Sequence, residues 1–217
     1  MCLCKSVTNK YLLFFSFALT VAAQPISLGV EGGVPITDAF QTFRGNSAFY
    51  ATNTKRYVVG PTIQFHFPPR LTLEIDGLYR RLGYQYQQIT PTTVFRSTVA
   101  NSWEFPALVK FDVLPGPIRP FVGAGASFRH ISGIEEVQRT VTAGGLIAAN
   151  FNNAPEFNKR NDIGLVLGGG VTFKFGRVRI SPEFRYTRWG SEAFRDPVRA
   201  LLNSDRNQGD FLLGLTF

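Results

Sequence analysis

The chain has 217 residues, a formal net charge of +8 at pH 7, 44% hydrophobic residues and 14% aromatic residues. This length suits one domain with a sizeable core, and the positive charge favours anionic partners such as lipid phosphates. Beyond the N-terminal segment, a membrane helix is excluded, because no stretch reaches the roughly 18 uncharged apolar residues that such a helix needs.

The first residues, MCLCKSVTNKYLLFFSFALTVAAQP, have the layout of a secretory signal peptide. Lys5 and Lys10 precede an apolar stretch over 11–22, and small residues follow it. Cleavage after Ala23 gives a signal peptide over 1–23 and a mature domain over 24–217. The cysteines, Cys2 and Cys4, fall within the signal peptide, so the mature chain has no thiol for a disulfide or a metal site. Because the chain is exported, nucleic acid is not an expected partner.

The mature chain repeats one pattern, in which apolar and other residues alternate over segments of about ten residues separated by turn-rich stretches. Such alternation predicts β-strands, because successive side chains of a strand point to opposite faces. We predict eight strands, over 26–34, 57–67, 71–84, 102–113, 119–130, 163–175, 178–189 and 210–217.

The two faces of these strands differ strongly in chemistry. One face is large and apolar, as in the last strand, where Phe211, Leu213, Leu215 and Phe217 share it. A soluble sandwich would also alternate, with its polar side in water. Here the opposite face carries the charged residues Glu31, Glu74, Asp76, Glu104, Lys110, Lys174, Arg179, Glu183 and Arg185.

The lengths of the connecting links separate a soluble sandwich from a membrane barrel. Short links at 68–70, 114–118 and 176–177 alternate with long links at 35–56, 85–101, 131–162 and 190–209. Tyrosine and tryptophan gather at the long-link ends and phenylalanine at the short-link ends, as amphipathic rings at one membrane interface would. We therefore predict an all-β fold: an eight-stranded antiparallel up-and-down transmembrane β-barrel whose first and last strands pair, with four long extracellular loops.

Two strands break the pattern. Leu78, Leu82 and Phe128 fall out of phase with the apolar face, which predicts a bulge near Gly77 and leaves the phase of the fifth strand open.

At this point the sequence resembles the bacterial outer-membrane β-barrel families, specifically the small eight-stranded OmpA- and OmpX-like barrels, over residues 24–217. The resemblance lies in ISLGVEGGVPIT, WEFPALVKFDV, RPFVGAGASF and the closing FLLGLTF. It implies a place in the outer membrane of a double-membraned bacterium. The closing segment resembles the signal read by the barrel-assembly machinery, with Phe211, Leu213, Leu215 and Phe217 at every second position, although the family often has Tyr where Leu215 stands.

The interior of an eight-stranded barrel is just wide enough for side chains, so the nearly balanced charges predict a ladder of buried ion pairs. Arg129 joins this ladder if the fifth strand keeps its phase. A narrow ion path, a proton relay or a solute channel is the functional alternative to this structural plug. His66 also faces inward, but it has no second His or Cys at ligand spacing, and we expect no metal or cofactor.

His130 and Ser132 form the sharpest catalytic candidate, because the His-x-Ser spacing puts both side chains on one strand face. The pair resembles, weakly, that of the outer-membrane lipid A deacylases, with Gly133 where that family has Asn. The nearby carboxylates, Glu135 and Glu136, fall in the predicted loop. The alternative is a solvated histidine at the rim.

Basic residues at the long-link side, Arg80, Arg81 and Arg188, are expected to contact phosphates of the outer-leaflet lipopolysaccharide. The loop over 131–162 contains the apolar run Leu146-Ile147-Ala148-Ala149, a candidate partner surface. We predict a non-enzymatic, monomeric protein acting in envelope integrity, adhesion or surface interaction. The alternatives are a lipid A-modifying enzyme and a narrow solute channel.

Overall fold

A computed structural model describes residues 26–42, 48–88, 92–142, 144–152, 159–191 and 202–217. The predicted signal peptide, 1–23, lies outside the described residues. No described segment forms a helix long and apolar enough to cross a bilayer. The strands are β1 (Ile26–Pro35), β2 (Phe40–Thr42), β3 (Ala48–Thr52), β4 (Val58–Phe67), β5 (Leu71–Asp76), β6 (Leu78–Gln88), β7 (Thr93–Asp112), β8 (Ile118–Thr142), β9 (Gly145–Phe151), β10 (Asn161–Phe175), β11 (Val178–Trp189), β12 (Leu202–Ser204) and β13 (Asn207–Thr216).

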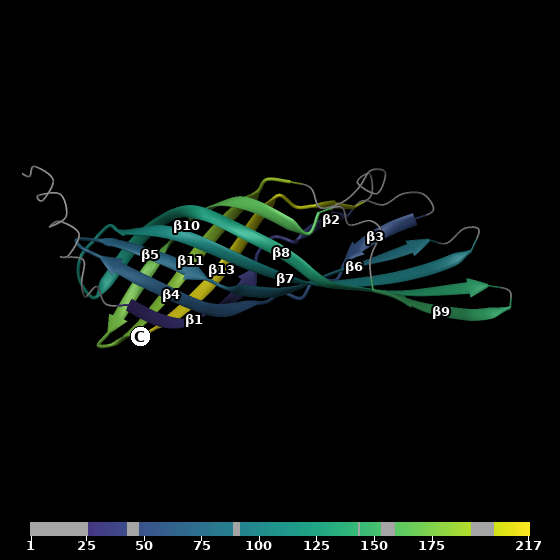
Figure 1. Cartoon of the computed structure of the whole chain (residues 1–217), viewed down its shortest axis with the longest axis horizontal. Coiled ribbons are helices and arrows are strands. Elements are labelled where there is room, and N and C mark those ends of the chain that lie inside the picture. Colours follow the sequence, from purple (N-terminus) through teal and green to yellow (C-terminus); the bar gives the residue numbers. More distant parts are fainter. Residues whose placement is uncertain (1–25, 43–47, 89–91, 143, 153–158, 192–201) are drawn as a thin grey trace, which may run out of the picture.

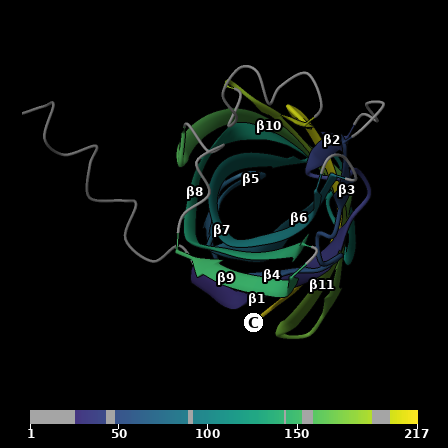
Figure 2. The same cartoon turned by 90° about the vertical axis from the view of Figure 1, so that its right-hand side faces the viewer.

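The principal strands close into an antiparallel ring, as predicted. β1 pairs with β4 on one side and with the last strand, β13, on the other, where Val30 stands opposite Leu215. The ring continues from β4 through β5 and β6 to β7, β8, β10 and β11, which pairs with β13. Counting β5 and β6 as one interrupted strand, this is the eight-stranded barrel, and it is seen end-on in Figure 2.

The prediction of a bulge near Gly77 is wrong. Thr62 faces Asp76 and Val59 faces Tyr79, so the register of β4 against β5 and β6 does not shift across Gly77. The hydrogen-bond ladder is interrupted there because the neighbouring strands place prolines beside Gly77. The carbonyl of Pro61 accepts a hydrogen bond from the Gly77 amide at 3.0 Å, but Pro61 has no amide hydrogen to donate in return. Leu78 and Leu82 consequently keep the inward phase of Glu74 and are buried.

The bulge is instead on β8, at Gly133. Asn101 of β7 faces Ser132, whereas Val99 faces Glu135, so β8 carries one extra residue between these pairs. Gly133 has a φ of 56°, the left-handed conformation that glycine adopts without steric cost. The bulge also settles the phase of the fifth strand: Phe128 is exposed on the outer face, and the inward phase passes from Ile131 to Ile134.

The outer surface of the ring is apolar. Large hydrophobic side chains point outward along β1, β4, β5, β7, β8, β10, β11 and β13, for example Leu165 (70% exposed) on β10, and Phe217 (68% exposed) does so at the chain end. The predicted apolar face therefore lies on the outside of a closed cylinder, where hydrocarbon can solvate it.

At the long-link end, β6, β7 and β8 run on past the ring and are flanked by β3 and β9 (Figure 1). We call this five-stranded sheet, in the order β3-β6-β7-β8-β9, the extension. It corrects the predicted loops 85–101 and 131–162, most of whose described residues are strand. The alternation of the barrel strands continues into the described parts of β6, β7 and β8 within these links.

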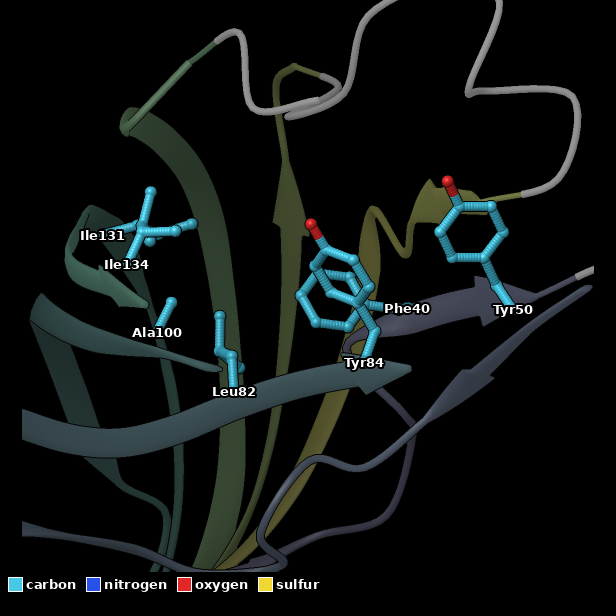
Figure 3. Close-up of a cluster of buried hydrophobic side chains, with 7 residues drawn as sticks. All are labelled: Phe40, Tyr50, Leu82, Tyr84, Ala100, Ile131 and Ile134. Atoms are coloured by element: carbon cyan, nitrogen blue, oxygen red, sulfur yellow. The ribbon is translucent and has the colours of Figure 1, made fainter. Parts of the chain in front are cut away.

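An apolar cluster covers the lumen where the extension begins. Leu82, Ala100, Ile131 and Ile134 point inward from β6, β7 and β8, and Phe40 of β2 packs edge-on against Tyr84 with ring centroids 5.6 Å apart (Figure 3). The charged interior below is thereby separated from the extension by a layer of buried hydrocarbon.

Candidate functional site

The centre of the lumen holds a cluster of ion pairs around Arg185 of β11. Its guanidinium contacts four carboxylates, Asp76 at 2.8 Å, Glu74 and Glu183 at 2.9 Å and Glu31 at 3.3 Å. All five side chains are buried. A single cation thus ties β11 to β1, which lies beyond β13, and to β5 on the opposite side of the ring.

Lys110 of β7 completes this central cluster. Its ammonium lies 2.6 Å from Glu74 and contacts Glu183, and Gln64 donates to the other oxygen of Glu74 at 2.7 Å. Glu74 and Glu183 thus each gain a further donor, whereas one oxygen of Glu31 and one of Asp76 have no hydrogen-bond partner among the described residues. Geometry of this kind is what makes a buried ion cluster tolerable.

A second cluster lies nearer the extension, around Arg80 of β6. The guanidinium contacts Glu104 at 3.1 Å and Asp210 at 3.0 Å, and Gln208 donates to both carboxylates. Arg80 is 2% exposed, so its predicted place at the lipopolysaccharide-facing rim is wrong. Without a register shift at Gly77, an even-numbered residue of β6 must point into the lumen.

The sequence prediction missed Asp210 and Gln208, although both share the inward phase of Leu212 in the last strand. Arg129 is buried as its conditional prediction required. It lies 4.1 Å from the centre of the Trp189 ring and 3.3 Å from Asp162. Trp189 is fully buried and donates to Gln208 at 2.9 Å, which corrects its predicted place at the membrane interface.

Two predicted members of the charge ladder lie elsewhere. Lys174 and Arg179 are at the short-turn mouth of the barrel, below the central cluster, and neither forms an ion pair among the described residues. Arg179 donates to Ser27 at 2.8 Å and contacts the ring of His66. His66 in turn lies 2.9 Å from the Thr72 hydroxyl and within reach of Ser27.

Three central carboxylates, Glu31, Glu74 and Asp76, are close enough to share a cation, with oxygens within 4.8 Å of one another. Arg185 already contacts each of them. The guanidinium therefore stands where a metal ion would.

His130 and Ser132 lie on the outer side of β8, near the end of the barrel from which the extension projects. The Nδ1 of His130 lies 2.6 Å from the side-chain oxygen of Asn161 on β10. An amide stands where a catalytic triad needs a carboxylate to stabilise the imidazolium. Glu136, one of the carboxylates considered for that role, is buried beyond the bulge, where it lies 3.4 Å from Thr98 and 3.8 Å from Arg96.

Aromatic rings cluster on the outside of the barrel at the same level, where Trp103 is the cross-strand partner of both Tyr79 and His130. Tyr79 lies between Tyr57 and Trp103, with ring centroids 6.3 Å and 5.2 Å away, and its hydroxyl donates to Asn101 at 2.8 Å. Arg81, two residues further along β6, and Arg188 on β11 are exposed on this outer side. Both therefore occupy the position expected of residues that face lipid headgroups.

The extension contains a groove of about 690 Å³. Its walls combine apolar and aromatic side chains with two arginines, Arg96 and Arg139, and no acidic residue lines it in the described part of the chain. Arg96 lies 5.5 Å from the centre of the Tyr86 ring. The groove is lined by Phe49, Ala51, Gln85, Tyr86, Gln87, Phe95, Arg96, Ser97, Val137, Arg139, Val141 and Leu146.

A closed antiparallel ring with an apolar outside and paired charges inside defines a small transmembrane β-barrel. Residues 22–190 match the model of the outer membrane protein beta-barrel domain family. The chain belongs to this family, and its place is the bacterial outer membrane.

Several solved structures resemble the chain. Neisserial surface protein A is 14% identical, with 88% of this chain and 95% of that chain covered and a TM-score of 0.41. The attachment invasion locus protein of Yersinia pestis is 12% identical, with 88% and 94% covered and a TM-score of 0.39. The N-terminal barrel of OprF from Pseudomonas aeruginosa is 10% identical, with 88% and 97% covered and a TM-score of 0.35. No curated protein matches the sequence.

Proposed function

We propose that this protein is a non-enzymatic surface-binding protein of the outer membrane, whose groove in the extension takes an extended, apolar and acidic segment of a partner protein. The observation that carries the proposal is the groove itself: a large concave surface, apolar and exclusively basic in its charge, held outside the membrane. Concave apolar sites with a few placed polar groups are typical binding sites.

Strand β9 supports this choice of partner. Among the described residues it pairs with β8 on one side only and ends the order of the sheet, so its other edge offers backbone donors and acceptors that no described strand uses. Leu146 and Ile147 are 66% and 60% exposed. An open, apolar edge is the surface to which an extended peptide adds as a further strand, and Arg139 beside it favours acidic side chains.

The test uses the protein in lipid nanodiscs and two synthetic peptides, one alternating valine with aspartate and one alternating valine with lysine. Fluorescence anisotropy should detect binding of the acidic peptide alone. Leu146→Glu should abolish it, because Leu146 lines the groove. Ile147→Glu, on the adjacent residue with similar exposure but outside the groove, should leave it unchanged. Equal binding of both peptides, or equal loss in both variants, would contradict the proposal.

A second proposal concerns the rim. Arg81 lies on the lipid-facing side two residues beyond Tyr79, and Arg188 is exposed on β11 two residues beyond Tyr186. We infer that both bind phosphates of lipopolysaccharide by charge-assisted hydrogen bonds. The variant Arg81→Gln with Arg188→Gln should retain less lipopolysaccharide on purification and sensitise cells to detergent. Lys55→Gln with Arg56→Gln provides a control of equal charge loss in the neighbouring link.

The two alternative functions have direct tests. A lipid A deacylase needs Ser132, so wild type and Ser132→Ala should leave lipid A with identical acyl chains in mass spectrometry. A channel needs an open lumen, so proteoliposomes containing the protein should swell in sugar solutions no faster than empty liposomes. Altered lipid A in the wild type alone, or rapid swelling, would replace the proposed function with the corresponding alternative.

A further inference from the structure

The short-turn mouth of the barrel forms a basic cup. An enclosed space of about 30 Å³ and a wider opening of about 260 Å³ share six lining residues. These are His66, Thr72, Asp112, Arg119, Lys174 and Arg179. The cup lies on the other side of the central cluster from the extension and opens to the opposite side of the membrane.

Like charges face each other across this cup. Lys174 of β10 and Arg179 of β11 are direct cross-strand partners, and both point inward. Arg119 of β8 faces Thr172, two residues from Lys174 on the same side of β10. Cations placed directly opposite on neighbouring strands repel each other and destabilise the pairing.

The described residues offer little compensation for this repulsion. Asp112 is the only carboxylate lining the cup, and its oxygen lies 3.5 Å from Arg119. The ammonium of Lys174 has no ion-pair partner among the residues that the structure describes. Arg70, at the wider opening, donates to the backbone carbonyl of Val113 at 3.0 Å. The cup therefore has a surplus of positive charge and hydroxyl groups, Thr72 and Ser181, beside it.

We propose that this cup binds a doubly charged tetrahedral oxyanion, that is, phosphate or the phosphate group of a larger molecule. Arg119, Lys174 and Arg179 converge on it from three adjacent strands, and a compact anion accepting bonds from all three replaces their repulsion with attraction. The opening of about 260 Å³ admits such a group from the water at the short-turn side.

Calorimetric titration with inorganic phosphate tests the proposal, with the protein in maltoside micelles, which contain no phosphate, and with chloride at matched ionic strength as the reference. The wild type should bind phosphate. Lys174→Gln with Arg179→Gln should lower the affinity at least about tenfold, because it removes two of the three cations that hold the anion by charge-assisted hydrogen bonds. Arg177→Gln, which removes one positive charge from the adjacent exposed turn and does not line the cup, should bind as the wild type does.

Thermal unfolding gives an independent readout, because substitution of Lys174 should raise stability when phosphate is absent although it lowers the affinity for phosphate. Without phosphate, Lys174→Gln should unfold at a higher temperature than the wild type, because it removes the repulsion. With phosphate, the wild type should gain stability and the variant should not. Lys174→Arg should retain the response, and the heat-dependent gel mobility of a folded barrel verifies that each variant is folded.

Phosphatidylglycerol added to the micelles distinguishes the two sources of the phosphate group. Binding of inorganic phosphate alone identifies a soluble anion as the ligand. Retention of phosphatidylglycerol in native mass spectrometry, lost in the double variant and kept in Arg177→Gln, identifies a lipid headgroup. The proposal is overturned if neither phosphate nor the lipid distinguishes the double variant from Arg177→Gln.

Discussion

Arg80 and Asp210 join two strands of the barrel that are not neighbours, with 3.0 Å between their side-chain nitrogen and oxygen. One residue lies on β6 and the other on the closing strand β13, 130 positions later. Both side chains are buried. The ion pair therefore braces the lumen across β4 and β1.

Arg80→Leu should destabilise the barrel by about 3–5 kcal/mol, because Glu104 and Asp210 would remain buried without their cation. Urea unfolding in lipid vesicles measures the loss. Arg81→Leu removes the same charge from the next residue, which points outward, and should change the free energy of unfolding by less than about 0.5 kcal/mol. Similar losses in both variants would show that Arg80 is not part of a buried brace.

Leu167→Arg should cost about 2–4 kcal/mol if the exposed face of β10 meets the middle of the bilayer. Leu167 is 57% exposed. The control is Leu146→Arg, where a leucine of 66% exposure lies in the extension; it should leave barrel stability unchanged. The free energy of unfolding in vesicles decides between them, and an equally mild effect at both positions would contradict a lipid environment for Leu167.

Gly133→Ala should destabilise the protein by about 1–2 kcal/mol, because alanine pays for the left-handed backbone that the bulge requires. A Cβ there would also lie 2.6 Å from the Asn101 amide nitrogen, which can rotate away. Gly144→Ala, at the tip of the extension with no atom nearer than 3.9 Å, is the matched control. Equal stability of the two variants would rule out a strained bulge.

Phe217→Ala should reduce the amount of assembled barrel in the outer membrane severalfold if the C-terminal residues are the assembly signal that the resemblance implies. Phe175→Ala removes an outward ring of nearly equal exposure, 65% against 68%, at the same end of the barrel. Quantifying folded protein by heat-dependent gel mobility separates recognition from lost hydrophobic contact, because the latter would affect both variants alike.

Period-two alternation was sufficient to predict the ring, its closure and seven of the charged residues in the lumen clusters. In a strand with one face in lipid, the residues on that face recur at every second position. It also placed Lys174 and Arg179 on the inner face. Alternation does not show how far along the barrel axis a residue lies, so it did not distinguish the central cluster from the short-turn mouth. Pairing partners also depend on the three-dimensional closure, which brings Asp210 beside Arg80 and Arg185 beside four carboxylates.

The remaining errors have local causes. Leu78 and Leu82 suggest a bulge if every apolar residue of a strand faces lipid. Both are instead buried in the lumen, Leu78 against Val58 and Leu212, and Leu82 in the cluster around Tyr84. The extension was missed because turn residues and polar strands have similar composition. The bulge that the structure shows, at Gly133, lies in the predicted loop over 131–162, where no strand is expected.

The length of β8 determines where the proposed partner would meet this protein. Its 25 residues, at about 3.3 Å each, run for about 80 Å, whereas about 9–11 tilted residues suffice to cross the hydrocarbon. The remainder, hydrogen-bonded to β7 and β9, forms a stiff stalk that presents the groove beyond the lipid headgroups. A preformed stalk has little backbone entropy left to lose on association, so more of the contact energy appears as affinity than a flexible tether would allow.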